Sequence, residues 1–221
     1  LENGANSSFV HLLLDENTPP STVVVDPIGV VEAAGAGPPP RIPLPLNVYG
    51  GDRVNSMGVD LSVAAERAAL VSAVERLPRI GSGPETVRNP ATGDVVGHVK
   101  EANAEEIDRA FTAAKAAQPA WDAAGGPARA KVLRAMADAL EANRDHLIAL
   151  CTREAGKTLA DGIAEVREAA DFCRYYAFLA LTKFAGPEVL KGPVGETNTL
   201  ELRGRGVFAC ISPWTFPLAI F

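Results

Sequence analysis

The last stretch of the chain, residues 202–221, constrains the fold more than any other. The apolar run Val207–Ile211 has a β-branched residue at each end, which is typical of a strand covered on both faces in a parallel sheet. Pro213 and Pro217 follow this run, fix the backbone angle φ at two points and exclude a helix across Ser212. We therefore expect a strand that ends in a rigid, irregular corner, and open α/β sheets bind ligands at such strand ends.

The residues of this corner leave two interpretations open. Trp214, Thr215 and Phe216 stand between the two prolines. Either they line a ligand cleft, or they belong to a loop that only packs its aromatic side chains, since large aromatic residues are mostly buried. The choice depends on whether Trp214 is accessible at the corner or sealed in a core.

Composition and charge exclude several classes of function. A chain of 221 residues has room for one good-sized core or two small ones. The net charge of −6 and the lack of Lys/Arg clusters argue against a nucleic-acid partner, and no apolar run approaches the ~18 residues of a spanning helix. The chain begins with Leu1 rather than Met, and Leu12–Leu14 is too short for a signal peptide. We expect an internal piece of a longer protein.

The cysteines and histidines indicate neither a metal site nor an activated nucleophile. Cys151, Cys173 and Cys210 match no zinc or CxxC spacing, and their neighbours are apolar or helical. We interpret them as structural thiols in a reducing cytoplasm. The histidines are isolated in the sequence and are expected to be ordinary surface or packing residues.

Residues 18–45 differ in composition from the rest of the chain. Eight of the 17 prolines lie here, including the run Pro38–Pro40. Such a segment is expected to be extended or irregular rather than helical. Apolar residues such as Val23–Val25 and Ile42 indicate that it lies across a folded surface. We therefore predict an inter-domain connection over residues 17–58.

Capping signals predict two of the following helices. Asp60 or Ser62 caps a helix that runs to about Leu77, and Asn103 with Glu106 forms a capping box at the start of the next one.

Glycines and prolines predict the later helix boundaries. Pro127 takes the first helical position after a glycine pair. Gly156 ends the helical stretch that follows, and Thr158 begins a long helix over residues 160–181. The Gly-Lys-Thr run is no phosphate-binding loop, because the glycine that this pattern needs five residues earlier is Cys151.

Short alternating segments predict strands. Residues 86–87 and 95–100 form a hairpin around a turn at 89–94, and residues 196–203 form an edge strand after a loop over 186–195. On the long helix, Glu165, Arg167 and Glu168 are interpreted as a solvated charged face.

Several motifs carry a resemblance to a known family. ISPWTFPLAIF (211–221) resembles the ISPWNFP segment of the NAD(P)-dependent aldehyde dehydrogenase superfamily, and its LAIF ending is similar to the proline utilisation A proteins. EVREAADFCRYYA (165–177) resembles glutamate-semialdehyde dehydrogenases, and EAGKT (154–158) resembles a structural helix turn of the superfamily. LENGANSSF at the start resembles the end of the proline dehydrogenase barrel of proline utilisation A.

This resemblance implies an α/β fold. The chain would be the N-terminal part of an aldehyde dehydrogenase fold, with helices, a β-hairpin and the first Rossmann-type strand, preceded by a proline-rich inter-domain connection. Residues 1–16 would be the tail of the proline dehydrogenase barrel, 17–58 the connection, and 59–221 the truncated dehydrogenase domain.

The resemblance also implies site residues. The NAD cleft would be lined by Ile211, Ser212, Pro213 and Trp214, and Glu168 and Phe216 would lie near the substrate, with no metal. Thr215 stands where the family has an Asn whose amide helps hold the oxyanion formed when a cysteine attacks the aldehyde. A Thr hydroxyl has one donor on a shorter arm. Losing an oxyanion donor typically costs roughly 100- to 1,000-fold in turnover, so we expect a poor dehydrogenase.

The function implied by the resemblance is that of a bifunctional bacterial enzyme of proline catabolism. An FAD-dependent barrel, whose site lies outside this chain, oxidises proline to pyrroline-5-carboxylate. An NAD-dependent domain then oxidises glutamate semialdehyde to glutamate. The family implies a homo-oligomer in the cytoplasm, with peripheral membrane association left open. Taken alone the chain is expected to be inactive and only partly folded, because helices that should cover a sheet have none to cover.

Two other functions remain open at this point. A monofunctional glutamate-semialdehyde dehydrogenase has the same dehydrogenase motifs, but the LENGANSSF segment and the proline-rich connection argue against it. A non-catalytic helical interaction protein with a proline-rich arm belongs to a different class, and Thr215 gives it slight support. A cysteine nucleophile downstream of the corner would favour the enzymes.

Overall fold

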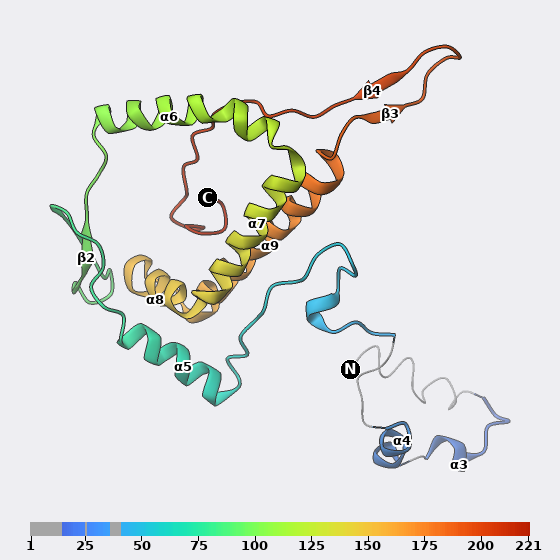
Figure 1. Ribbon diagram of the computed structural model, residues 1–221. Coiled ribbons are helices and arrows are strands. Elements are labelled where there is room, and N and C mark those ends of the chain that lie inside the picture. Colours follow the sequence, from blue (N-terminus) through green and yellow to red (C-terminus); the bar gives the residue numbers. More distant parts are fainter. Residues whose placement is uncertain (1–14, 25, 36–40) are drawn as a thin grey trace. The chain divides into compact units, whose positions relative to one another are not determined.

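The computed structural model describes residues 15–24, 26–35 and 41–221 (Figure 1). By its internal contacts the chain divides into two units, Leu1–Leu44 and Pro45–Phe221. The segment assigned to a barrel tail, residues 1–16, lies outside the described residues except for its last two. The division into tail, connection and dehydrogenase domain therefore stays a prediction.

Two short helices in the first unit correct the expectation for residues 18–45. They are α3 (Pro20–Val23) and α4 (Pro27–Ala33). Each begins with proline at its first position, where the missing N–H group is not needed for an intrahelical bond. Asp26 caps α4 by accepting a hydrogen bond of 3.0 Å from the Ile28 amide. The prediction of wholly extended or irregular backbone is therefore wrong.

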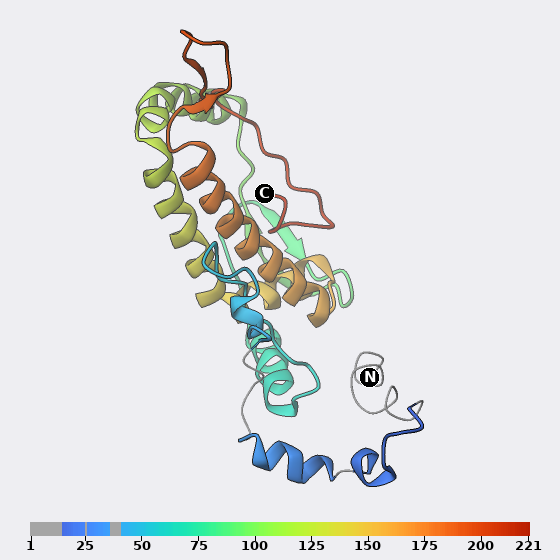
Figure 2. The ribbon, with the colours of Figure 1, turned by 90° about the vertical axis from the view of Figure 1, so that its right-hand side faces the viewer.

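The second unit is mainly helical. After a 3₁₀ turn, Pro45–Asn47, its helices are α5 (Ala64–Glu75), α6 (Ala104–Ala123), α7 (Gly125–Ala142), α8 (Arg144–Ala155) and α9 (Leu159–Lys183). In Figures 1 and 2, α7 and α9 lie side by side along most of their length. None of the helices in the described part of the chain is long and apolar enough to cross a membrane.

Small residues allow α7 and α9 to approach each other closely. Ala130, Ala177 and Ala180 form one buried cluster between the two helices, and Leu133 and Leu181 pack against it. A Cβ atom on Gly126 would collide with the main-chain oxygens of Ala180 and Phe184. Contact of the first turn of α7 with the last turn of α9 means that the two helices are antiparallel.

Most predicted caps are confirmed because they depend only on neighbouring residues. Asn103 with Glu106 forms the capping box of α6, and Thr158 with Asp161 forms that of α9. Gly156 ends α8 in the left-handed conformation with φ of 69°.

Two other helix starts differ from prediction. The cap of α5 is Val63, without a side-chain bond, because the Asp60 carboxylate bonds Ser62 instead. At the start of α7, Gly125 is the first helical residue, so Pro127 occupies the third position.

The strands form two antiparallel hairpins. β1 (Glu85–Arg88) pairs with β2 (Val95–Val99), which confirms the predicted hairpin. β3 (Glu188–Leu190) pairs with β4 (Asn198–Leu200), so the predicted loop over 186–195 contains a strand and the predicted strand is shorter.

The strand predicted at Val207–Ile211 is absent. Residues 201–213 have no regular secondary structure, and Phe208 and Ile211 are exposed. Within the described part of the chain, residues 207–212 form no main-chain hydrogen bonds. A parallel strand exists only beside a neighbouring backbone, and the described residues place none there. The expectation of a strand covered on both faces is therefore wrong for this chain.

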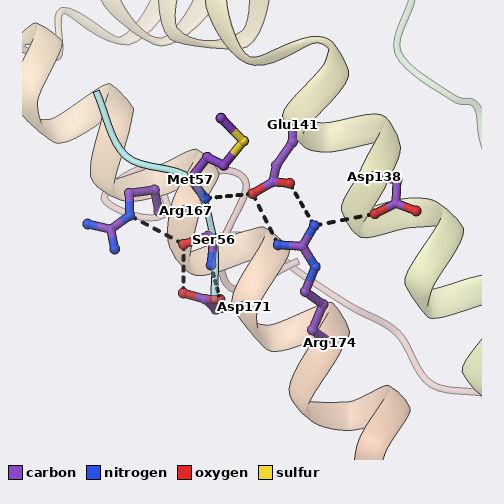
Figure 3. A network of polar contacts seen from close by, with 7 residues as sticks. All are labelled: Ser56, Met57, Asp138, Glu141, Arg167, Asp171 and Arg174. Carbon is purple, nitrogen blue, oxygen red and sulfur yellow. Dashed lines mark hydrogen bonds and ion pairs between the residues drawn. The ribbon is translucent and has the colours of Figure 1, made fainter. Parts of the chain in front are cut away.

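A polar network fastens the segment before α5 to the helices (Figure 3). Ser56 is buried, and its amide and hydroxyl donate to the Asp171 carboxylate of α9 at 2.8 and 2.7 Å. The Met57 amide donates to Glu141 of α7 at 2.8 Å, and Arg174 of α9 binds both oxygens of that carboxylate at 2.6 and 3.1 Å. This segment is therefore fixed to α7 and α9.

The main core lies where α5, α8 and α9 meet. It consists of Leu70, Ile148, Ile163 and Val166, all buried. Leu218, close to the end of the chain, packs against this cluster. The core thereby connects the helices directly to the terminal corner.

Candidate functional site

The terminal corner is an irregular turn, as the two prolines predict. The Phe216 amide donates to the Pro213 carbonyl at 3.1 Å, and the Ser212 hydroxyl donates to the Pro217 carbonyl at 3.0 Å. Residues 214–220 are turns and bends without a helix. Both hydrogen bonds join residues within the corner and so define the shape of its backbone.

The side chains of the corner are accessible. Ile211 is 89% exposed, Trp214 69% and Phe216 41%. The alternative interpretation, a loop that only packs its aromatic side chains, is therefore wrong for Trp214. Ile211 and Trp214 therefore present an exposed apolar face beside backbone that has no regular secondary structure.

Lys157 holds the corner from the helical side, although the sequence analysis gave it no role in a site. Its ammonium group donates to the Thr215 carbonyl at 2.6 Å. The same nitrogen lies 5.9 Å from the ring centroids of both Trp214 and Phe216. The side chain is largely buried, since only 11% of it is exposed. The EAGKT match was the one signal at this position, and it was interpreted as a structural helix turn.

The position of Glu165 corrects a prediction from the sequence. It was assigned to a solvated charged face, but it is 3% exposed. Its carboxylate lies 3.6 Å from the Lys157 ammonium and accepts from the amides of Leu218 and Ala219 at 3.1 and 3.3 Å. Burial of this carboxylate follows from its partners, which come from outside its own helix.

The substrate residues inferred from the resemblance lie in different surroundings. Phe216 is part of the corner, beside Lys157. Glu168 lies on α9 one turn after Glu165 and is half-buried. In the residues that the structure describes, no hydrogen bond or ion pair joins Glu168 to the corner. Its role at a substrate entrance stays a prediction.

An apolar groove of about 930 Å³ opens beside the corner. It is lined by α7, the start of α8, α9 and residues 217–221. Phe172 and Tyr176 contribute from α9, and Leu218 and Phe221 contribute from the corner. The groove shows that apolar surface continues from the corner across the helices.

Two cysteines are in environments that suppress the thiolate. Burial raises the pKa of the Cys151 thiol above its ordinary value of 9.0, and the nearby Glu165 carboxylate raises it further. Burial also raises the pKa of Cys173. Neither side chain is an activated nucleophile, which agrees with the structural role expected for them. Among the described residues, no group of three or more His, Cys, Asp or Glu could hold a metal ion.

Comparison with known proteins identifies close relatives of this chain. Over its whole length it is 40% identical to the bifunctional protein PutA of Escherichia coli (strain K12), and it spans 17% of that protein. A crystal structure of a Bradyrhizobium japonicum Proline Utilization A variant matches with a TM-score of 0.77 at 39% identity, over 100% of this chain and 20% of that one. A Thermus thermophilus 1-pyrroline-5-carboxylate dehydrogenase variant matches with a TM-score of 0.68 at 27% identity, over 76% of this chain and 36% of that one.

The family follows from the match over the second unit. The aldehyde dehydrogenase family matches residues 81–221, which include β1, β2, α6 to α9 and the terminal corner. These helices and short strands form the N-terminal portion of the aldehyde dehydrogenase fold. The chain belongs to the aldehyde dehydrogenase family.

Proposed function

We propose that this chain is part of a bifunctional enzyme of proline catabolism and contributes one wall of its NAD-dependent aldehyde dehydrogenase site. The similarity to PutA over the whole chain supports the proposal. The reaction assigned to this domain converts glutamate semialdehyde, NAD⁺ and water to glutamate, NADH and two protons. Oxidation of proline by an FAD-dependent domain would belong to the parent protein, with its site outside this chain.

The observation that carries the proposal is the exposed corner. Ile211 and Trp214 present apolar side chains, and the backbone before them has no regular secondary structure, with amides that form no main-chain hydrogen bond within the described residues. A dinucleotide needs flat apolar surface and polar main-chain groups that are free to bind it. These residues offer both kinds of group. Ile211, Ser212, Pro213 and Trp214 would hold NAD, and bound NAD supplies the acceptor for the hydride.

The residues of this chain have two tasks in that reaction. Residues 211–214 orient the cofactor, and Thr215 offers a hydroxyl where charge develops on the substrate oxygen. Glu168 and Phe216 are proposed to lie near the substrate. A homo-oligomer in the bacterial cytoplasm remains part of the proposal by family resemblance.

Activity of the full-length protein tests the proposal. Purified protein is supplied with NAD⁺ and pyrroline-5-carboxylate, which hydrolyses to glutamate semialdehyde, and NADH formation is followed by absorbance. We expect turnover with this substrate, and loss of NAD affinity in Trp214→Ala with Trp121→Ala as the control. A protein that binds no NAD, or that prefers an unrelated aldehyde over glutamate semialdehyde, contradicts the proposal.

A further inference from the structure

We propose that Lys157 and Glu165 are positioning residues of the site, which together fix the main chain of residues 215–219 and so the placement of the cofactor-binding residues before it. The inference rests on the proposed function of the corner. We call these two residues the Lys157–Glu165 pair.

Both side chains of the Lys157–Glu165 pair are largely buried. Lys157 and Glu165 have side chains that are 11% and 3% exposed, and their charged groups lie 3.6 Å apart. Charges removed from water are tolerated only when their hydrogen-bonding capacity is used. Here much of that capacity is directed to the corner, so the charges and the corner stabilise each other.

The main-chain contacts of the pair are concentrated in five residues. Lys157 binds the Thr215 carbonyl at 2.6 Å, and one oxygen of Glu165 accepts from the amides of Leu218 and Ala219 at 3.1 and 3.3 Å. Hydrogen bonds with a charged partner are about twice as strong as neutral ones. Hydrogen bonds therefore hold the segment at the Thr215 carbonyl and at the amides of Leu218 and Ala219.

Rigid elements carry both members of the pair. Gly156, in the left-handed conformation, turns the chain sharply at the end of α8, and the Lys157 amide donates to the Cys151 carbonyl at 3.2 Å. Glu165 follows on the second turn of α9, next to the core residue Val166. Side chains supported in this way hold a neighbouring site to a single geometry.

The contacts reach the residues that the proposed chemistry uses. Fixing the Thr215 carbonyl also fixes the main chain that carries the Thr215 side chain, which we propose for the oxyanion position. The ammonium group lies 5.9 Å from the centroids of Trp214 and Phe216, within the range of cation–π attraction. Loss of the pair should therefore loosen the cofactor-binding corner and leave the chemical groups themselves unchanged.

Hydrogen exchange in the full-length protein tests the main-chain part of the inference. Lys157→Met and Glu165→Gln are compared with Lys183→Met, which breaks an exposed ion pair with Glu188. Exchange of the amides of Leu218 and Ala219 should become about tenfold faster in the first two variants and stay unchanged in the control. Unchanged exchange in all three variants overturns the proposal.

Two further variants guard against misfolding and against a merely structural effect. Lys157→Arg keeps the charge and should restore most of the protection at Leu218 and Ala219. The double variant Lys157→Met with Glu165→Gln removes both charges, so it leaves no unpaired buried charge that could unfold the domain. It should still show the faster exchange.

Kinetics separate this inference from the proposed function. In Lys157→Met the KM for NAD should rise about tenfold while kcat changes less, because cofactor placement is lost and the reacting groups remain. Faster exchange with an unaltered KM overturns the link to the cofactor. Faster exchange in a protein that never binds NAD confirms the positioning of the main chain and rejects the proposed function.

Discussion

At the scale of single residues, Thr215 is the residue that we propose for the oxyanion position. Its carbonyl is held by Lys157, while the residue itself is exposed. The main-chain position is thus set by a contact that does not depend on the Thr215 side chain. A substitution at Thr215 therefore tests the proposed oxyanion donor without changing this contact.

Thr215→Asn should raise turnover of glutamate semialdehyde by tenfold or more in the full-length protein. An Asn amide offers two donors on a longer arm than a Thr hydroxyl, and one oxyanion donor is typically worth about 100- to 1,000-fold. Steady-state NADH formation measures the change, with Thr215→Val as the variant that has no donor. An unaltered rate in Thr215→Asn contradicts the assigned role.

Glu141 should make the stability of the second unit depend on pH in acid. Partial burial opposes its ionisation, but hydrogen bonds from Arg174 and from the Met57 amide outweigh this and lower the pKa of Glu141 below its ordinary value of 4.5. A lowered pKa in the folded state contributes stability that is present above about pH 4.5 and is lost as the pH falls below it.

Glu141→Gln measures this contribution. At about pH 7 its free energy of unfolding in urea should be lower than that of the unsubstituted protein by about 1–3 kcal/mol. The difference should shrink as the pH falls below about 4.5, whereas Glu188→Gln on the surface should show little effect at any pH. A difference that is constant with pH argues against the ion pair.

At the scale of elements, the antiparallel contact between α7 and α9 organises the helices. It depends on Gly126 at one end and on Arg174 with Glu141 further along. The first allows close approach of the backbones, and the second joins the helices by two charged hydrogen bonds.

Gly126→Ala should weaken that contact. The added Cβ would meet the main-chain oxygens of Ala180 and Phe184, which cannot move without shifting α9. Overpacking of this kind costs about 1–3 kcal/mol, measured as a lower midpoint in urea unfolding. Gly186→Ala is the matched control, because a Cβ there meets nothing within 4 Å. Equal stability of the two variants would show that α7 and α9 accommodate the added methyl group without loss of folding free energy.

The success of sequence-based prediction differed between elements for a physical reason. The capping box at Asn103 and the left-handed Gly156 were predicted because their partners lie within a few residues. The burial of Glu165 was missed because its partners are Lys157 and the main chain more than 50 residues later. The strand at Val207–Ile211 was predicted from composition, but pairing needs a neighbouring backbone.

In the candidate site, too, local features were predicted and long-range contacts were missed. The prolines predicted the irregular turn at Trp214, because they restrict the local backbone. No local signal indicated that Lys157 would bind the Thr215 carbonyl. Resemblance to a family supplied the role of the corner, and the three-dimensional contacts supplied the residues that hold it.

At the scale of the whole chain, the segment before α5 directly follows the boundary between the two units, which lies between Leu44 and Pro45. Residues 45–58 carry no strand or long helix, yet Ser56 is buried. The Asp171 carboxylate binds its amide and hydroxyl, and Arg53 donates to the Asp171 carbonyl at 3.2 Å. One residue of α9 therefore anchors the segment at two points.

Asp171→Asn should release this segment without unfolding the helices. An amide offers one oxygen in place of two, so either the amide or the hydroxyl of Ser56 loses its acceptor, a loss of about 1–3 kcal/mol for a buried group. Trypsin cleavage after Arg53 should then become about tenfold faster, since local opening exposes the peptide bond. Asp108→Asn, an exposed position on α6, is the control and should cleave at the original rate. Equally slow cleavage in both variants would mean that the hydrogen bond from the Met57 amide to Glu141, rather than the Asp171 carboxylate, holds the segment.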